Sequence, residues 1–199
     1  RYHHLFAQML RTRLTNQHPE LTGQLYGRAY EWYQTNDRLE DAIPYALKGG
    51  LFDQAADIIE AIGQRLYWHN RGPTLRIWLR ALPDHVFDER PDLQILNIYI
   101  QIHKGDLIAA ERAADKAQQF LQQGAPPSVG GHQIFAGQLA AATTAIVFHR
   151  HLDASRGEQL TREALSLLPP DYYYDRCVAA FHGAGSSILL GKLPEASQY

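Results

Sequence analysis

Residues 25–60 read LYGRAYEWYQTNDRLEDAIPYALKGGLFDQAADIIE, and this stretch decides the fold class. It contains two successive helical segments, each opened by a short turn, at Asn36–Arg38 and at Gly49–Gly50. Alanines recur at helical spacing in both segments. Small residues at such positions let helices approach closely, and short turns make consecutive helices antiparallel neighbours. We therefore predict stacked helix hairpins, an architecture that builds surfaces for binding partners.

The rest of the chain follows the same helical pattern. No segment shows sustained β-type alternation, whereas apolar residues recur at helical spacing throughout. Pro44 lies inside one predicted helix, where it should produce a kink or a late start. The predicted helices end near Asn16, begin at Pro19, and then cover 39–48, 52–66, 74–82 (capped by Thr74), 92–104, 110–121, 133–150, 156–168 and 172–190. We treat 84–92 as a connector. The predicted fold class is all-α: antiparallel hairpins stacked into a right-handed superhelix like that of tetratricopeptide (TPR) repeats.

The turns divide the chain into two parts. The first alanines after successive turns, Ala110, Ala154 and Ala196, are 44 and 42 residues apart, which suits two-helix repeats. Ala42 and Ala55 are only 13 residues apart, so the first part has a more compact layout. This places a boundary near residues 70–73. Both ends look cut, and we expect a piece of a longer protein.

Composition restricts the class of function. The 199 residues carry a formal net charge of −2 and no basic stripe, so no nucleic-acid contact is expected. The longest nearly apolar run, 139–148, is too short to cross a membrane. The single cysteine, Cys177, favours a reducing compartment, and we expect a cytoplasmic protein.

The ten histidines do not form a recognisable metal motif. His3 and His4 are adjacent and His149 and His151 are two apart, and neither spacing places both rings on one helical face. No HExxH or CxxC accompanies them. Likewise, the Gly-Lys-Leu sequence at 191–193 lacks the upstream glycine and the hydroxyl of a phosphate-binding loop. We predict no metal site and no nucleotide chemistry in this segment.

No catalytic residue is predicted either. Ser186 and Ser187 lack the context of a nucleophile, and Cys177 beside Val178 indicates an inert core thiol. The cluster around 171–175, DYYYD, could bind a sugar or an amine, although packing of the tyrosines is the interpretation we favour. The small residues at 183–187, GAGSS, are typical of close helix packing. We therefore predict that the segment is not an enzyme.

Several stretches together resemble one family. They are RYHHLFAQMLRTR at 1–13, AYEWY, LEDAIPYAL and GLFDQAADII within 29–59, the segment from Thr74 to Pro83, and RPDL at 90–93. In this order they resemble MalT-like, LuxR-type ATP-dependent transcription activators of the signal-transducing P-loop ATPase class. Beyond residue 93 the similarity is only repeat-like. Pro44 departs from the histidine or polar residue expected at that position.

The resemblance implies a domain order. In that family a nucleotide-binding domain and a winged-helix region precede a TPR-like superhelix, and a helix-turn-helix domain ends the protein. By resemblance, 1–15 is the tail of the winged-helix region, 16–72 a helical linker and 73–199 the first repeats. His3 matches a family histidine near the nucleotide switch. ATP or ADP would bind in the parent protein, and no cofactor is expected in this segment.

Our first functional hypothesis is a signal-sensing and interdomain-coupling module. Its partners would be a small-molecule effector or a regulatory protein, together with other domains of the same chain, but neither nucleic acid nor membrane. Polar residues on the first helix of each hairpin are candidate groove contacts: Asn97, Gln101, Gln138 and Arg176. The alternative is a stand-alone TPR-like adaptor that binds a peptide or protein. A helical hydrolase that uses the histidines is the hypothesis we favour least.

Overall fold

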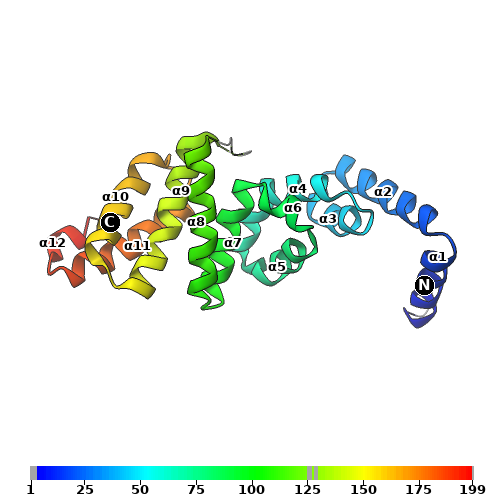
Figure 1. Ribbon diagram of the computed structural model, residues 1–199, viewed down its shortest axis with the longest axis horizontal. Helices are drawn as coiled ribbons and strands as arrows, with labels where there is room; N and C mark the ends of the chain where they lie inside the picture. Colours follow the sequence, from blue (N-terminus) through cyan, green and yellow to red (C-terminus); the bar gives the residue numbers. More distant parts are fainter. Residues whose placement is uncertain (1–3, 125–126, 128–129, 199) are drawn as a thin grey trace.

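The computed structural model describes residues 4–124, 127 and 130–198, and every regular element in this part of the chain is helical. Consecutive helices pack against each other in an elongated stack, with the two termini at opposite ends (Figure 1). The elements in chain order are α1 (His4–Gln17), α2 (Pro19–Thr35), α3 (Leu39–Lys48), α4 (Phe52–Leu66), the π-helical turn η1 (Tyr67–Arg71), α5 (Gly72–Ala81), α6 (Asp84–Asp88), α7 (Pro91–His103), α8 (Leu107–Gln123), α9 (Gly131–Ile146), the π-helical turn η2 (Val147–His151), α10 (Ala154–Leu167), α11 (Tyr173–Leu189) and α12 (Leu193–Ala196). The predicted all-α, repeat-like fold is confirmed.

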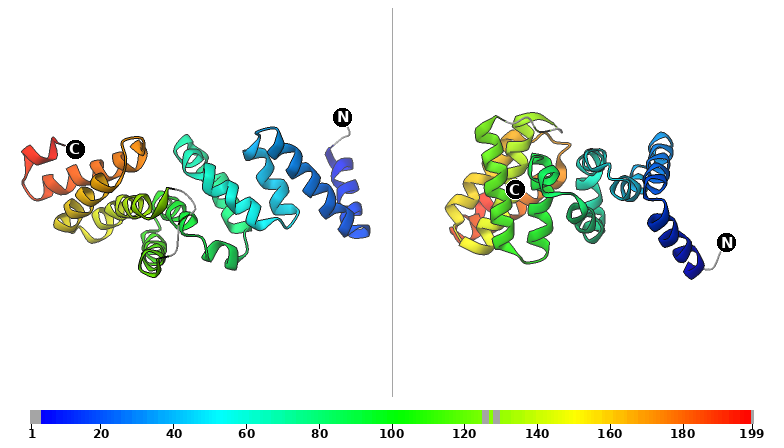
Figure 2. Two further views of the ribbon diagram at one scale, coloured as in Figure 1. Left: turned by 90° about the horizontal axis from the view of Figure 1, so that it is seen from above. Right: turned by 45° about the vertical axis from the view of Figure 1, so that its right-hand side comes forward.

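Short capped turns produce the hairpins in the second half of the chain. Asp106 precedes α8, and its side chain accepts a hydrogen bond from the backbone N–H of Ala109 at 3.1 Å. Asp153 caps α10 in the same way through the N–H of Arg156 at 2.9 Å. Such caps satisfy backbone donors that a helix leaves unpaired at its start. The tight packing of α7 with α8 and of α9 with α10 follows from these turns (Figure 2).

The repeat spacing differs from the alanine overlay. The residues that precede α8, α10 and α12 are Asp106, Asp153 and Lys192, which are 47 and 39 residues apart. Ala154 is the first residue of α10, whereas Ala110 is the fourth residue of α8. The α10 residue equivalent to Ala110 is therefore Gly157, and the steps of 44 and 42 are wrong. Loops of unequal length between the helices cause the shift.

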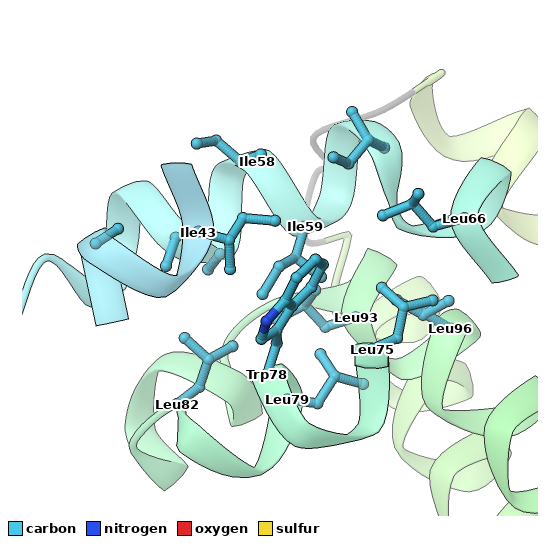
Figure 3. Close-up of a cluster of buried hydrophobic side chains, with 14 of the residues drawn as sticks. Ile43, Ile58, Ile59, Leu66, Leu75, Trp78, Leu79, Leu82, Leu93 and Leu96 are labelled. Atoms are coloured by element: carbon cyan, nitrogen blue, oxygen red, sulfur yellow. The ribbon is translucent and has the colours of Figure 1, made fainter. Parts of the chain in front are cut away.

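The largest hydrophobic core joins the helices of the first half of the chain to α7. Trp78 lies among side chains from α3, α4, α5 and α7, including Ile43, Ile59 and Leu93 (Figure 3). This core therefore contains residues on both sides of the predicted boundary at 72/73. The division into 1–15, 16–72 and 73–199 stays a prediction.

Two further cores hold the repeats together. In the first, the alanines of α8 pack against apolar residues of α7 and α9, and Ala110 and Ala117 are fully buried. In the second, α9, α10 and α11 meet around Ala141, Ala164 and Ala179. The alanines allow the helices to approach closely, as the pattern predicted.

Three local predictions need correction. The helix at 39–48 begins at Leu39 and continues through Pro44, so a late start is wrong; a proline there removes only one hydrogen bond inside the helix. The next correction concerns α5, which begins at Gly72 with Pro73 in its first turn, so Thr74 is not its cap. The connector after Pro83 contains the short helix α6.

Cys177 is the fourth correction. It is exposed on α11, on the face that also carries the exposed side chains of Tyr173 and Phe181. The apolar neighbours in sequence suggested a core position. That face of α11 points away from α9 and α10, which is why the thiol is not buried.

An ion-pair cluster centred on Arg90 joins the start of α7 to α4. The guanidinium contacts the carboxylates of Asp57 at 2.6 Å, Glu60 at 2.9 Å and Asp53 at 3.1 Å. The Arg90 side chain is 19% exposed and that of Glu60 only 3%. Burial lowers the pKa of Arg90, but its hydrogen bonds to Asp57 and Asp53 and the charge of Glu60 raise it more, so the pKa lies above its ordinary value.

Replacing Arg90 with alanine should lower the free energy of unfolding by about 1–2 kcal/mol, because Glu60 stays buried after its cation is removed. Urea denaturation measures the change. Arg38→Ala is the matched control, since Arg38 and its partner Asp41 are about half exposed. Its effect should stay below about 0.5 kcal/mol. Equal effects of the two substitutions would contradict a specific role for the Arg90 cluster.

Candidate functional site

A buried carboxylate lies at the junction of four helices. Asp175, in the first turn of α11, is 1% exposed. Its carboxylate accepts hydrogen bonds from the hydroxyl of Tyr99 at 2.6 Å and from the amide of Gln64 at 2.6 Å. The amide of Gln138 lies 3.4 Å from the same carboxylate and donates to the Gln64 side-chain oxygen at 3.1 Å. We call these four residues the Asp175 network.

The Asp175 network connects the two parts of the chain. Gln64 belongs to α4, Tyr99 to α7 and Gln138 to α9, so these partners are 111, 76 and 37 residues from Asp175 in sequence. Aromatic rings pack beside it: Tyr67 stacks on Tyr99 with ring centroids 5.6 Å apart. A movement of α4 relative to the repeats must therefore break or rearrange these hydrogen bonds.

Burial changes the ionisation of two members of the network. Removal from water raises the pKa of Asp175, and the hydrogen bonds from Tyr99, Gln64 and Gln138 oppose this shift only in part. The pKa of the Tyr99 hydroxyl is raised well above its ordinary value, first by burial and then by the charge of Asp175. The phenol therefore remains a donor toward the carboxylate at all pH values near neutrality.

The raised pKa of Asp175 predicts a pH-dependent stability. The folded chain binds the carboxyl proton more tightly than the unfolded chain, whose pKa is 3.8, so this carboxyl stabilises the fold more as the pH falls through its raised pKa. Asp175→Asn removes this titration. The unfolding free energy of the wild type minus that of the variant should increase between neutral pH and about pH 4 in urea denaturation. A difference that decreases over this range would show that the pKa is lowered.

A cleft of about 400 Å³ opens next to the network. Its walls come from α4, α7 and α9, and they combine acidic and amide groups with aliphatic side chains. The lining residues are Ile59, Glu60, Gln64, Asp92, Ile95, Leu96, Tyr99 and Gln138. Carboxylate and amide oxygens accept hydrogen bonds, so the cleft suits a small ligand that carries several donors and an apolar face.

The predicted groove contacts do not lie together. Gln138 alone lines the cleft and joins the Asp175 network. Asn97 and Gln101 hydrogen-bond to each other at 2.9 Å and line a different depression, of about 750 Å³, between α5 and α7. Arg176 donates to the carbonyl oxygens of Leu165 and Leu168, at the end of α10.

The remaining predicted positions are quickly placed. Arg176 thus closes a helix terminus, and an effector contact by any of the four groove residues stays a prediction. His3 lies outside the described residues. Within the described residues no group of three or more histidine, cysteine, aspartate or glutamate side chains is arranged to hold a metal ion. None of the described helices combines the length and hydropathy that a bilayer crossing needs.

Sequence reasoning missed Gln64 and Tyr99 and left the role of Asp175 open. The DYYYD cluster was a usable signal, because an aspartate among aromatic residues near a helix start is an unusual core residue. The structure separates the two acids, since Asp171 is exposed whereas Asp175 is buried. Tyr174 packs by stacking on Trp68 with ring centroids 5.2 Å apart, whereas Tyr173 is exposed.

The fold and the cleft define a class of protein: an all-α helical-repeat module with a polar cleft at the junction of its cores. The chain is 24% identical over 178 residues to the HTH-type transcriptional regulator MalT of Yersinia pestis (strain Pestoides F), a match that covers 89% of this chain and 19% of that protein. It is 26% identical over 173 residues to the serine/threonine-protein kinase PknK of Mycobacterium tuberculosis (strain H37Rv), with coverage of 85% and 15%. No family model and no solved structure matches the chain.

The two relatives differ in their named activities, yet both align with most of this chain. The chain spans less than a fifth of the length of either. The similarity to a MalT-type regulator is distant but extends over most of the chain described above. It supports a regulatory helical module as the coarse description of the chain.

Proposed function

We propose that this chain is the signal-sensing and coupling module of a MalT-like transcriptional regulator. It binds a small-molecule effector or a regulatory protein and relays that event to nucleotide-binding and DNA-binding domains elsewhere in the parent protein. ATP or ADP and DNA would contact those other domains, and the module itself performs no catalysis. The parent protein acts in the cytoplasm. The distant similarity to MalT regulators supports this proposal.

The Asp175 network is the observation that carries the proposal. It joins α4, before the predicted boundary, to the first helices of three successive hairpins, and its polar atoms border the cleft. Coupling between two sites requires an element with two arrangements that a ligand binds with different affinity. A ligand that hydrogen-bonds to Gln64 or Gln138 competes with the network and therefore favours one arrangement of α4 relative to the repeats.

Thermal denaturation of the 199-residue chain tests the binding step. The cleft chemistry selects the panel, which consists of small polyhydroxylated and amine-bearing compounds. A binder should raise the melting temperature, and Gln138→Ala should weaken binding about tenfold. Gln101→Ala is the matched control, because Gln101 is a glutamine outside the cleft. The binding site is wrong if no compound shifts the melting temperature, or if both variants weaken binding equally.

The relay is tested in the parent protein. An effector that binds the cleft should change the affinity for ATP, and ATP should change the affinity for the effector by the same factor. A compound that binds without this reciprocal change would show a sensor site with no coupling.

A stand-alone adaptor is the second candidate function, and one observation favours it. The outward face of α11 carries exposed apolar side chains, among them Tyr173, Phe181 and Ile188. Such a face suits a partner helix. The flanking reading frame distinguishes the two functions, since an upstream phosphate-binding loop and a downstream helix-turn-helix support the regulator.

A further inference from the structure

Two histidines from different hairpins meet at the far end of the repeats. His149 belongs to η2 and His182 to α11, and their Nε2 atoms are 3.3 Å apart. The ring centroids are 5.2 Å apart and the rings are nearly perpendicular. His182 is 8% exposed, whereas His149 is exposed to solvent.

One hydrogen bond determines the tautomer of His182. Its Nδ1 lies 2.8 Å from the carbonyl oxygen of Val178. A carbonyl oxygen can only accept, so Nδ1 carries the hydrogen, and in the neutral ring Nε2 presents its lone pair toward His149. The same arrangement, with one ring nitrogen donating to a carbonyl, orients histidines that bind metal ions. Burial lowers the pKa of His182, which favours the neutral ring.

The distance between the two nitrogens suits a shared ion. Imidazole nitrogens bind Zn²⁺ at about 2.0–2.1 Å, and a tetrahedral angle at the metal then places two such nitrogens about 3.3–3.4 Å apart. The observed 3.3 Å agrees with this value, so small rotations of the rings would let both lone pairs converge on one ion.

The surroundings hold the pair in place and leave one side open. The ring centroids of Phe148 and Phe181 lie 5.6 Å and 5.2 Å from that of His182. Gly185 makes room for Phe148, because a Cβ atom there would lie 2.7 Å from the phenyl ring. No third histidine, cysteine or carboxylate joins the pair among the described residues. Water would therefore complete the coordination.

We propose that His149 and His182 form a two-histidine chelate for one divalent ion of the zinc, copper or nickel type. Imidazole suits these ions, whereas magnesium and calcium prefer oxygen ligands. A bound ion links η2 to α11 and so connects the last two hairpins. This site is separate from the proposed effector cleft, and its test does not depend on that function.

Isothermal titration of the untagged chain with zinc chloride, and separately with nickel chloride, tests the site. We expect one ion per chain, a rise in melting temperature, and no response to magnesium chloride. His149→Ala should weaken zinc binding about tenfold or more. Because His149 is exposed, this variant should remain folded. His182→Gln provides a second test on the buried side.

Matched controls separate this site from other histidines. His151→Ala removes an exposed histidine that contacts Glu111 on α8, and it should leave zinc binding unchanged. The proposal is overturned if zinc does not bind, or if His149→Ala binds zinc as tightly as the wild type. Equal losses in His149→Ala and His151→Ala would also overturn it. Nitrogen-15 spectra provide an independent readout: a zinc-induced shift of both Nε2 signals supports the chelate, and a shift of neither leaves only a hydrogen bond between neutral rings.

Discussion

Replacing Asp175 with alanine should lower the free energy of unfolding by about 3 kcal/mol. The substitution removes the acceptor of the Tyr99 hydroxyl and of the Gln64 amide, both at 2.6 Å. Each donor then stays inside the protein without its partner, and an unsatisfied buried donor costs about 1–3 kcal/mol. Part of this cost is offset, because the variant no longer buries a carboxylate.

Urea denaturation of both proteins at neutral pH measures the effect. Asp171→Ala is the matched control, since Asp171 lies four residues away and is exposed. Its effect should be within about 0.5 kcal/mol. Asp175→Asn keeps one acceptor oxygen and should give an intermediate loss. The Asp175 network does not stabilise the fold if the alanine variants at 171 and 175 have the same stability.

The second large effect is expected at Gly183, where α11 crosses α10. A Cβ atom added to this glycine would lie 2.5 Å from Cγ2 and 2.7 Å from Oγ1 of Thr161. Thr161 is fully buried, and its hydroxyl lies 2.9 Å from the carbonyl oxygen of Gly157 and 3.1 Å from that of Ala179. The side chain therefore cannot move aside. Gly183→Ala should lower the free energy of unfolding by about 2–3 kcal/mol, although alanine favours helices.

A double-mutant cycle and a control glycine make the Gly183 prediction specific. Thr161→Ala removes both contacting atoms, so Gly183→Ala should cost less in that background, by about 1 kcal/mol or more. Gly23 lies inside α2, and a Cβ atom added to it would have no neighbouring atom within 4 Å. Gly23→Ala should therefore stabilise the chain by about 0.5–1 kcal/mol. A loss at Gly23 equal to that at Gly183 would contradict the packing explanation.

Local sequence patterns predicted the helices well because the relevant interactions are local. Polar caps such as Asp106 and Asp153 act within three residues, and buried alanines recur every three or four residues along one face. The GAGSS stretch was correctly interpreted as close packing, as the contact between Gly183 and Thr161 shows. The repeat spacing was wrong because loop length varies, and alanine alone does not mark an equivalent position.

The candidate site was predicted only in part. Of the four groove residues only Gln138 lies at the cleft, because the polar side chains of one helix point in several directions. Asn97 and Gln101 are on the same helix as Tyr99, yet they border another depression. A polar residue on a helix is visible in the sequence, but the neighbour that it faces depends on how that helix is rotated in the stack.

The sequence by itself determined the helical class, most helix boundaries and the small residues that let helices pack closely. It also showed correctly that adjacent histidines diverge on a helix. Only the tertiary structure brought Asp175 to Gln64, which is 111 residues away, and His149 to His182, which is 33 residues away. Helix boundaries depend on contacts within one or two turns. Meetings between hairpins depend on helix lengths and crossing angles that add up along the whole stack.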